Sequence, residues 1–171
     1  CPAVDMNFDS ASAELVGEEG KGEKYFHKMA DKLNVAAAAM SVGIMKRSFQ
    51  EAFAYSQERL QGGQEIIKWS ELKMMIANMA ISIQNADMSL SMACRCVDAQ
   101  ECGWERCSRA AALEIQKTAC DVTTDGIQAM GGVGYMKDFG QEKRFRDAKH
   151  IQSLFGIAPV KRINYLDSMM K

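Results

Sequence analysis

Proline is nearly absent from this chain, and its scarcity constrains the fold more than any other feature of the sequence. Only two prolines occur in the 171 residues, Pro2 and Pro159. A proline inside a helix removes a backbone hydrogen bond and clashes with the preceding turn, so a segment without proline is free to stay helical. Almost all of the chain between the two prolines is therefore open to long helices.

The spacing of apolar residues predicts a first long helix that begins at about residue 23. Apolar side chains recur there at i, i+3, i+4 and i+7, which marks one face of a helix. We interpret as its buried stripe the residues Phe26, Met29, Leu33, Ala37, Met40 and Ile44. The helix is expected to end at the Gly62-Gly63 pair, because glycine commonly follows the last turn of a helix.

Two further long helices are expected after these glycines. The apolar seam of the second helix ends near Gln100 and consists of Leu72, Ile76, Met79, Ile83, Ala86, Leu90 and Ala93. Gly103 marks the next turn, and a third helix should run from about residue 105 to Met130 and stop at Gly131. The stripe of the third helix consists of Ala112, Ile115, Ala119 and Val122. The 13 methionines are interpreted mostly as core residues on these stripes.

Two short helices complete the predicted set, one at about residues 142–153 and one that starts near Pro159. Proline suits the first turn of a helix, where its missing N–H is not needed. Long amphipathic helices joined by short glycine turns pack in antiparallel fashion. The predicted fold is therefore all-α: an antiparallel four-helix bundle with short additional C-terminal helices.

The first 22 residues follow a different pattern. Val4 to Phe8 alternates apolar and polar side chains, which predicts a half-buried β-strand. Gly17, Gly20 and Gly22 then indicate a loop. We expect residues 1–22 to form a strand and a loop, and residues 23–171 to form the helical bundle.

Composition excludes several classes of function. A net charge of −1 favours neither nucleic acid nor an anionic membrane as a partner. No apolar run approaches the roughly 20 residues of a membrane span. The six cysteines come without a secretory signal, so we expect reduced thiols and a cytoplasmic location. A metal site is not expected, because Cys94 and Cys96 would diverge on one helix.

Four motifs, in order along almost the entire chain, resemble the C-terminal helical domain of the acyl-CoA dehydrogenase family. They are Glu14-Leu-Val-Gly-Glu-Glu-Gly-Lys-Gly22, Tyr55-Ser-Gln-Glu-Arg59, Thr123-Thr-Asp-Gly-Ile-Gln-Ala-Met-Gly-Gly-Val-Gly-Tyr135 and Arg146-Asp-Ala-Lys149. The resemblance implies that residues 1–22 are the end of a middle β-domain with its linker loop. The chain would then be a piece of a longer, divergent member of the family.

The same resemblance implies a function. Members of this family bind FAD between the subunits of a homodimer or homotetramer. They oxidise an acyl-CoA thioester to its trans-2-enoyl form and pass the electrons to an electron-carrier flavoprotein. This chain would contribute part of the flavin site and of the subunit interface, and it would not be active by itself.

The resemblance assigns FAD contacts to Arg59, Gln128, Gly131 and Gly132. Glycine lets a backbone approach a pyrophosphate closely, and guanidinium suits a bidentate contact with this anion. An ordinary helix cap and a surface Gln and Arg are the alternative interpretation of these residues. Asp31 matches an aspartate near the bound CoA thioester chain, although a solvated surface position is equally compatible with the sequence.

The catalytic carboxylate of the family is missing from this chain. Alignment on the Arg146–Lys149 motif puts Phe155 at the usual position of the base, and Leu33 at the alternative position on the first helix. Neither side chain can accept a proton, and no Asp or Glu lies between Lys149 and Tyr165. The base could come from outside this chain, or the protein could be a non-catalytic relative that serves as a flavin or acyl-CoA binding or assembly module.

Overall fold

The computed structural model describes residues 4–170, so Cys1 and Pro2 lie outside the described residues. The described chain is mostly helical, and its five α-helices are α1 (Gly22–Glu58), α2 (Ser70–Ala99), α3 (Trp104–Met130), α4 (Gln141–Gln152) and α5 (Ala158–Asp167). The remaining elements are short: β1 (Leu60–Gln61), β2 (Gln64–Glu65), and the 3-10 helices η1 (Ile66–Lys68) and η2 (Gly131–Tyr135).

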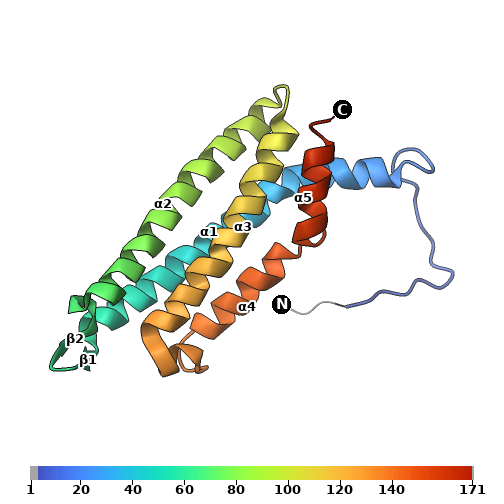
Figure 1. Ribbon diagram of the computed structural model, residues 1–171. Helices are drawn as coiled ribbons and strands as arrows, with labels where there is room; N and C mark the ends of the chain where they lie inside the picture. Colours follow the sequence, from blue (N-terminus) through green and yellow to red (C-terminus); the bar gives the residue numbers. More distant parts are fainter. Residues whose placement is uncertain (1–3, 171) are drawn as a thin grey trace.

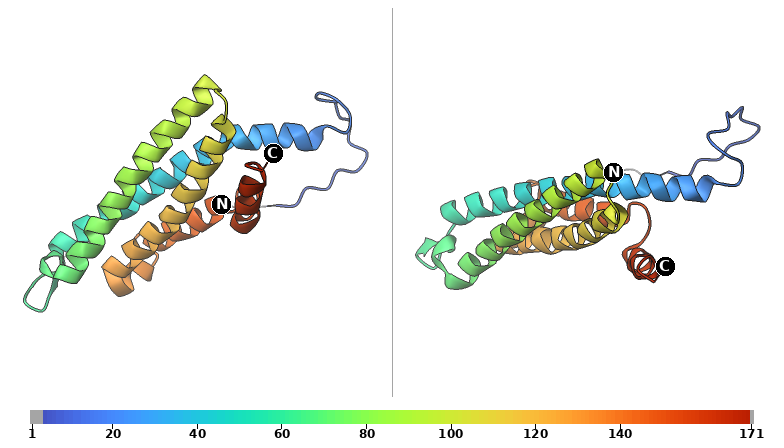
Figure 2. Two further views of the ribbon diagram at one scale, coloured as in Figure 1. Left: turned by 45° about the horizontal axis from the view of Figure 1, so that its top comes forward. Right: turned by 90° about the horizontal axis from the view of Figure 1, so that it is seen from above.

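The first four helices run alternately up and down, and this confirms the predicted antiparallel bundle (Figure 1). The first turns of α1 project beyond the bundle, and α5 lies to one side of it (Figure 2). At the opposite end, β1 and β2 form an antiparallel hairpin between α1 and α2. The molecule therefore has two distinct ends, a hairpin end and an α5 end, joined by the length of α3.

The core of the bundle is made largely of small side chains. Alanines from α1, α2, α3 and α4 are almost completely buried: Ala37, Ala38, Ala52, Ala93, Ala112, Ala119 and Ala148. Met45, Met79 and Ile115 fill the space between them. The most extensive helix contact joins α1 and α3, because small residues let two helix backbones approach closely.

A buried polar junction fastens α4 to the bundle. Ser48 Oγ on α1 donates to Gln141 Oε1 at 2.7 Å, and Gln141 Nε2 donates to the Ser48 carbonyl at 2.9 Å. Gly126 of α3 lies against this pair, where a Cβ would come within 2.2 Å of Ser48 Oγ. An ion pair between Arg144 and Glu51 strengthens the same contact. The position of α4 relative to α1 and α3 is thus fixed by hydrogen bonds as well as by packing.

The predicted helix boundaries and seams hold for α2 and α3, but two predictions for α1 are wrong. Its predicted stripe faces largely outward: Phe26, Met29, Leu33 and Met40 are each at least 40% exposed. The buried face instead carries smaller residues, which fit the close contact with α3: Ala30, Ala37, Ala38, Ser41, Val42 and Ser48. The helix also ends at Glu58, before Gly62 and Gly63, because these glycines form the turn of the hairpin at φ 63° and 83°.

Two other expectations are also corrected. Most methionines lie on the surface, and only Met45, Met79 and Met130 are buried. Residues 4–8 form no strand and are exposed, since no other strand in the described part of the chain pairs with them. The cysteines at positions 94, 96, 102, 107 and 120 carry free thiols.

Candidate functional site

A pocket of about 720 Å³ lies at the hairpin end of the bundle. It lies where the C-terminal end of α1, the hairpin, the start of α2 and the end of α3 meet. We call this cavity the hairpin pocket, and its lining residues are Tyr55, Arg59, Gln61, Gly62, Ile66, Trp69, Leu72, Gln128, Ala129, Met130, Gly131, Gly132 and Val133. All four predicted cofactor-binding residues, which come from two distant stretches of sequence, line this one pocket.

Arg59 reaches the hairpin pocket from the end of α1. Its backbone N–H donates to the Tyr55 carbonyl at 2.9 Å, and its own carbonyl accepts from the Ile66 N–H at 2.9 Å. The backbone is therefore held on both sides while the side chain is exposed. Among the described residues, the guanidinium of Arg59 forms no ion pair, so it can bind an anion without giving up another partner.

Gly131 and Gly132 end α3 on the opposite wall of the hairpin pocket. Gly131 has φ 61° and ψ −140°, a conformation that side chains other than glycine rarely adopt. A Cβ on either glycine would meet no atom of this chain within 4 Å. Gly134 differs, because a Cβ there would lie 2.6 Å from the Ile127 carbonyl oxygen. The backbone at Gly131 and Gly132 thus borders open space, and Gln128 stands exposed on the preceding turn.

Trp69, which was not predicted from the sequence, lines the hairpin pocket immediately before α2. Its indole Nε1 donates to the Gln61 carbonyl at 3.3 Å, and its ring covers Gly62, where a Cβ would come within 2.8 Å. The side chain remains 45% exposed. A ring at this place offers an apolar face to a planar ligand. The available signal was a tryptophan beside a helix start, which alone does not identify a site.

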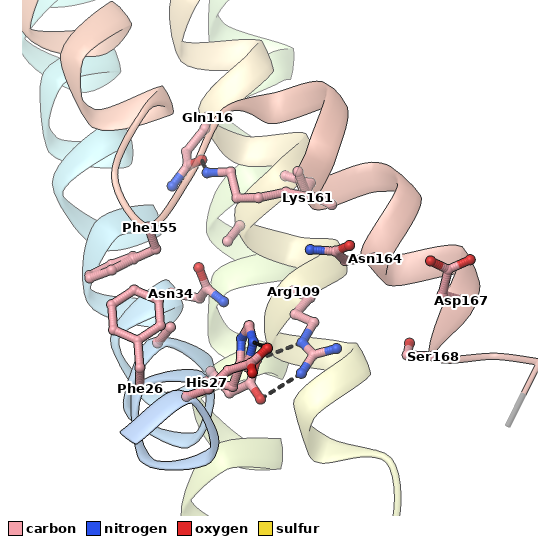
Figure 3. Close-up of a pocket in the computed structure, with 15 residues that line it drawn as sticks. Phe26, His27, Asn34, Arg109, Gln116, Phe155, Lys161, Asn164, Asp167 and Ser168 are labelled. Atoms are coloured by element: carbon pink, nitrogen blue, oxygen red, sulfur yellow. Dashed lines mark hydrogen bonds and ion pairs between the residues drawn. The ribbon is translucent and has the colours of Figure 1, made fainter. Parts of the chain in front are cut away.

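A second pocket of about 660 Å³ lies at the other end, under α5 (Figure 3). We call it the α5 pocket. Its lining residues are Glu23, Phe26, His27, Ala30, Asp31, Asn34, Arg109, Ala112, Leu113, Gln116, Phe155, Lys161, Asn164, Asp167 and Ser168. Gln116 and Gln128 are 12 residues apart on α3, or about 18 Å along its axis. The structure therefore brings Asp31 into a different cavity from the four predicted flavin contacts.

Asp31 is buried in the wall of the α5 pocket, where it forms a bidentate ion pair with Arg109. Arg109 Nε and Nη2 lie 2.5 and 2.7 Å from the two carboxylate oxygens of Asp31. Ser108 Oγ donates to the Asp31 carbonyl at 2.6 Å. The hydrogen bonds to Asp31 raise the pKa of the Arg109 guanidinium despite its burial. The solvated surface position that the sequence also allowed for Asp31 is therefore not what the fold provides.

Lys161 fastens α5 to the rest of the molecule. Its ammonium donates to Gln116 Oε1 at 3.2 Å and to the carbonyls of Gln152 and Leu154 at 3.0 Å each. Burial lowers the pKa of Lys161. No residue of α5 is itself buried, so this side chain supplies its main polar attachment within the described chain.

Phe155 lies in the turn that Lys161 holds, and it lines the α5 pocket. Its φ of 61° is unusual for a bulky residue. Figure 3 shows its ring beside the ring of Phe26 at one side of the pocket. Leu33, the other predicted position of a base, is 40% exposed and lines neither pocket.

Residues 4–170 contain neither a candidate membrane span nor a candidate metal site. None of the helices has the length and apolar character that crossing a membrane requires. No cluster of His, Cys, Asp and Glu in this range has the arrangement of a metal site.

Comparison with known proteins identifies a family model and individual relatives that agree with each other. The family described as acyl-CoA dehydrogenase, C-terminal domain, matches residues 20–170. A cyclohex-1-ene-1-carbonyl-CoA dehydrogenase of Syntrophus aciditrophicus is 32% identical over 95% of this chain and 40% of its own length. A short-chain specific acyl-CoA dehydrogenase of Clostridium acetobutylicum is 34% identical over 87% of this chain and 39% of its own.

The fold is also that of solved relatives. Butyryl-CoA dehydrogenase from Megasphaera elsdenii superposes with a TM-score of 0.84 at 27% identity, over 91% of this chain and 40% of that protein. This chain thus spans about 40% of the length of these relatives. The motifs, the bundle and the matched range agree, and the chain belongs to the acyl-CoA dehydrogenase family, as its C-terminal domain.

Proposed function

We propose that this chain is the C-terminal domain of an FAD-dependent acyl-CoA dehydrogenase, in which it forms part of the flavin site and of the subunit interface. The whole protein would catalyse α,β-dehydrogenation of an acyl-CoA thioester. One observation carries the proposal: Arg59, Gln128, Gly131 and Gly132 converge on the hairpin pocket although about 70 residues separate them in the sequence. The family membership supplies the cofactor and the class of reaction.

The hairpin pocket has the chemistry that a dinucleotide diphosphate requires. Arg59 offers an unpaired guanidinium for the pyrophosphate, and the Gln128 amide offers hydrogen-bond donors beside it. Gly131 and Gly132 leave their backbone open to close approach. FAD would supply the hydride-accepting ring of the reaction. In this proposal the adenosine diphosphate portion that these residues hold belongs to a neighbouring subunit.

The α5 pocket is the proposed place of the acyl group. Asp31, predicted to lie near the thioester chain, lines it, and so does Phe155, which stands where the family keeps its base. Because the Asp31 carboxylate is bound by Arg109, its role would be to hold the wall of the pocket rather than to take up a proton. The proton-accepting carboxylate would come from a part of the protein outside this chain.

A non-catalytic relative is the second candidate, and one observation favours it. The residues at both family positions for the base, Phe155 and Leu33, are hydrocarbon side chains. A protein of this kind would keep the bundle in order to bind flavin or acyl-CoA, or for assembly. The two candidates differ in whether a bound flavin becomes reduced.

The exposed face of α2 supports the proposed subunit interface. Met74, Ile81, Met88 and Met92 recur at seven- and four-residue spacing, and each is more than half exposed. A continuous apolar stripe of this kind is typical of a surface that another chain covers. We expect a homodimer or homotetramer. Sedimentation of the chain as a monomer at high concentration would contradict this expectation.

The proposal extends to an electron-carrier flavoprotein as acceptor. A solved structure described as an electron transferring flavoprotein of Acidaminococcus fermentans is similar to this chain, with 31% identity and a TM-score of 0.82 over 91% of this chain and 40% of that one. Reoxidation of the reduced protein by an added electron-carrier flavoprotein, monitored by absorbance, tests this step.

The test of function is flavin absorbance of the full-length protein before and after addition of acyl-CoAs of different chain length. Bleaching of the visible band supports a dehydrogenase whose base lies elsewhere. A bound flavin that stays oxidised supports the binding module, and Phe155→Glu is then expected to introduce bleaching, because it returns a carboxylate to the family position. A protein without flavin would refute the cofactor assignment.

A further inference from the structure

Two carboxamides in the wall of the α5 pocket offer hydrogen-bond donors to the cavity. Asn34 on α1 and Gln116 on α3 are 7% and 1% exposed, and both line the cavity. Gln116 Nε2 is a buried donor without a partner among the described residues, and the Asn34 amide lies in the wall of the same cavity. Buried amide groups are normally paired, so the unpaired Gln116 nitrogen needs an explanation.

The orientation of the Gln116 amide follows from its neighbour. Lys161 Nζ lies 3.2 Å from Gln116 Oε1, and an ammonium can only donate hydrogen bonds. The oxygen must therefore face Lys161, and the nitrogen must face the other way. Figure 3 shows the Gln116 nitrogen turned away from Lys161, with Asn34 between the two phenylalanine rings and the Arg109 guanidinium.

The charges around the pocket select against an ionised ligand group. Three carboxylates line it, those of Glu23, Asp31 and Asp167, against the two cations Arg109 and Lys161. Both cations are already engaged, Arg109 by the Asp31 carboxylate and Lys161 by three oxygens. Neither Arg109 nor Lys161 is free to bind an anion, whereas neutral amide hydrogens remain for an oxygen acceptor.

We infer that the acyl group bound in the α5 pocket carries a neutral oxygen, as a keto or hydroxyl group, which accepts hydrogen bonds from Asn34 and Gln116. The inference rests on the proposed function, since it assumes that this pocket takes the acyl group. The rings of Phe26 and Phe155 contact the hydrocarbon part.

The expected selectivity follows from the cost of an unmade hydrogen bond. A plain alkyl chain would cover both amides without pairing them, whereas an oxygen in the chain would satisfy at least one. A buried polar group left unpaired weakens binding by roughly tenfold to a hundredfold. This class of substrate is therefore preferred because a hydrocarbon chain is penalised.

The test is calorimetric titration of the full-length, flavin-loaded protein with three acyl-CoAs of equal chain length: hexanoyl-CoA, 5-oxohexanoyl-CoA and adipoyl-CoA. The oxo compound should bind at least about tenfold more tightly than hexanoyl-CoA. Adipoyl-CoA, whose far end is a carboxylate, should bind more weakly than the oxo compound. Equal affinity for hexanoyl- and oxohexanoyl-CoA, or tightest binding of adipoyl-CoA, would overturn the inference.

Substitutions locate the effect. Asn34→Leu should remove most of the preference without weakening hexanoyl-CoA, and Gln116→Met is a second variant of similar shape. Asn164→Leu is the matched control, because Asn164 lines the same pocket but is exposed, and it should keep the preference. A preference that survives both Asn34→Leu and Gln116→Met would contradict the assignment. If no acyl-CoA binds while flavin is present, the proposed function fails and this inference fails with it.

Discussion

Substitution of Gly126 by alanine tests the junction that fixes α4 against α1 and α3. The new Cβ would lie 2.2 Å from Ser48 Oγ and 2.9 Å from Gln141 Oε1. The Ser48 and Gln141 side chains are completely buried and hydrogen-bonded to each other, so neither can move without breaking these hydrogen bonds. Gly126 is therefore a position where the fold excludes even one methyl group.

The expected loss combines three effects. Overpacking of a close-packed core costs about 1–3 kcal/mol, and disruption of the Ser48–Gln141 hydrogen bonds adds about 1–3 kcal/mol. Removal of a glycine from a helix returns about 0.5–1 kcal/mol. The net expectation for Gly126→Ala is a loss of about 3 kcal/mol in the free energy of unfolding.

Gly43→Ala is the matched control, because Gly43 lies on α1, is exposed, and a Cβ there would meet nothing within 4 Å. This control should gain about 0.5–1 kcal/mol. Urea unfolding followed by far-UV circular dichroism measures both variants, and Ser48→Ala in the Gly126→Ala background should recover part of the loss. Equal stabilities of Gly126→Ala and Gly43→Ala would refute the packing argument.

Two further substitutions test other contacts. Arg109→Met leaves the buried Asp31 carboxylate without its bidentate partner. We therefore expect the free energy of unfolding in urea to fall by about 2–4 kcal/mol, and the Asp31→Asn/Arg109→Met double variant should recover part of this loss. An unchanged free energy of unfolding would contradict this expectation. Burial, together with Cys96, raises the pKa of the Cys107 thiol from 9.0 to about 11. Between these values the folded chain keeps a proton that the unfolded chain has lost, so stability should fall as the pH rises, and Cys107→Ala should flatten this slope in unfolding curves between about pH 8 and 11.

The sequence predicted the parts of the fold in which one helix face is plainly apolar. The predicted seams of α2 and α3 lie on the buried faces of these helices, although α2 also carries an exposed apolar stripe. On α1 both faces are apolar: one carries large residues such as Phe26 and Met40, and the other carries Ala37 and Ala38. The size of the side chains determines which face of α1 is buried, because only the small residues permit the close contact with α3. A pattern of apolar and polar residues carries no information about side-chain size.

Residues of the candidate sites could be predicted only where a local sequence motif marks them. The four residues that we propose to contact flavin could be singled out because each belongs to a local motif. The ion pair of Asp31 with Arg109 joins residues 78 positions apart, and no local pattern predicts such a contact. The Gly62-Gly63 turn had a local signal, since two glycines between short extended segments are typical of a hairpin, but a helix cap explains the same pair equally well.

The most direct test of the flavin assignment is the FAD affinity of the full-length protein when the charge at the hairpin pocket is removed. If Arg59 contacts the pyrophosphate, Arg59→Leu should lower the affinity by about tenfold or more without changing the free energy of unfolding. Arg47→Leu, which removes an exposed arginine of α1 outside the pocket, should leave the affinity unchanged. Equal FAD affinity in wild type and Arg59→Leu, measured by equilibrium dialysis, would contradict the assignment.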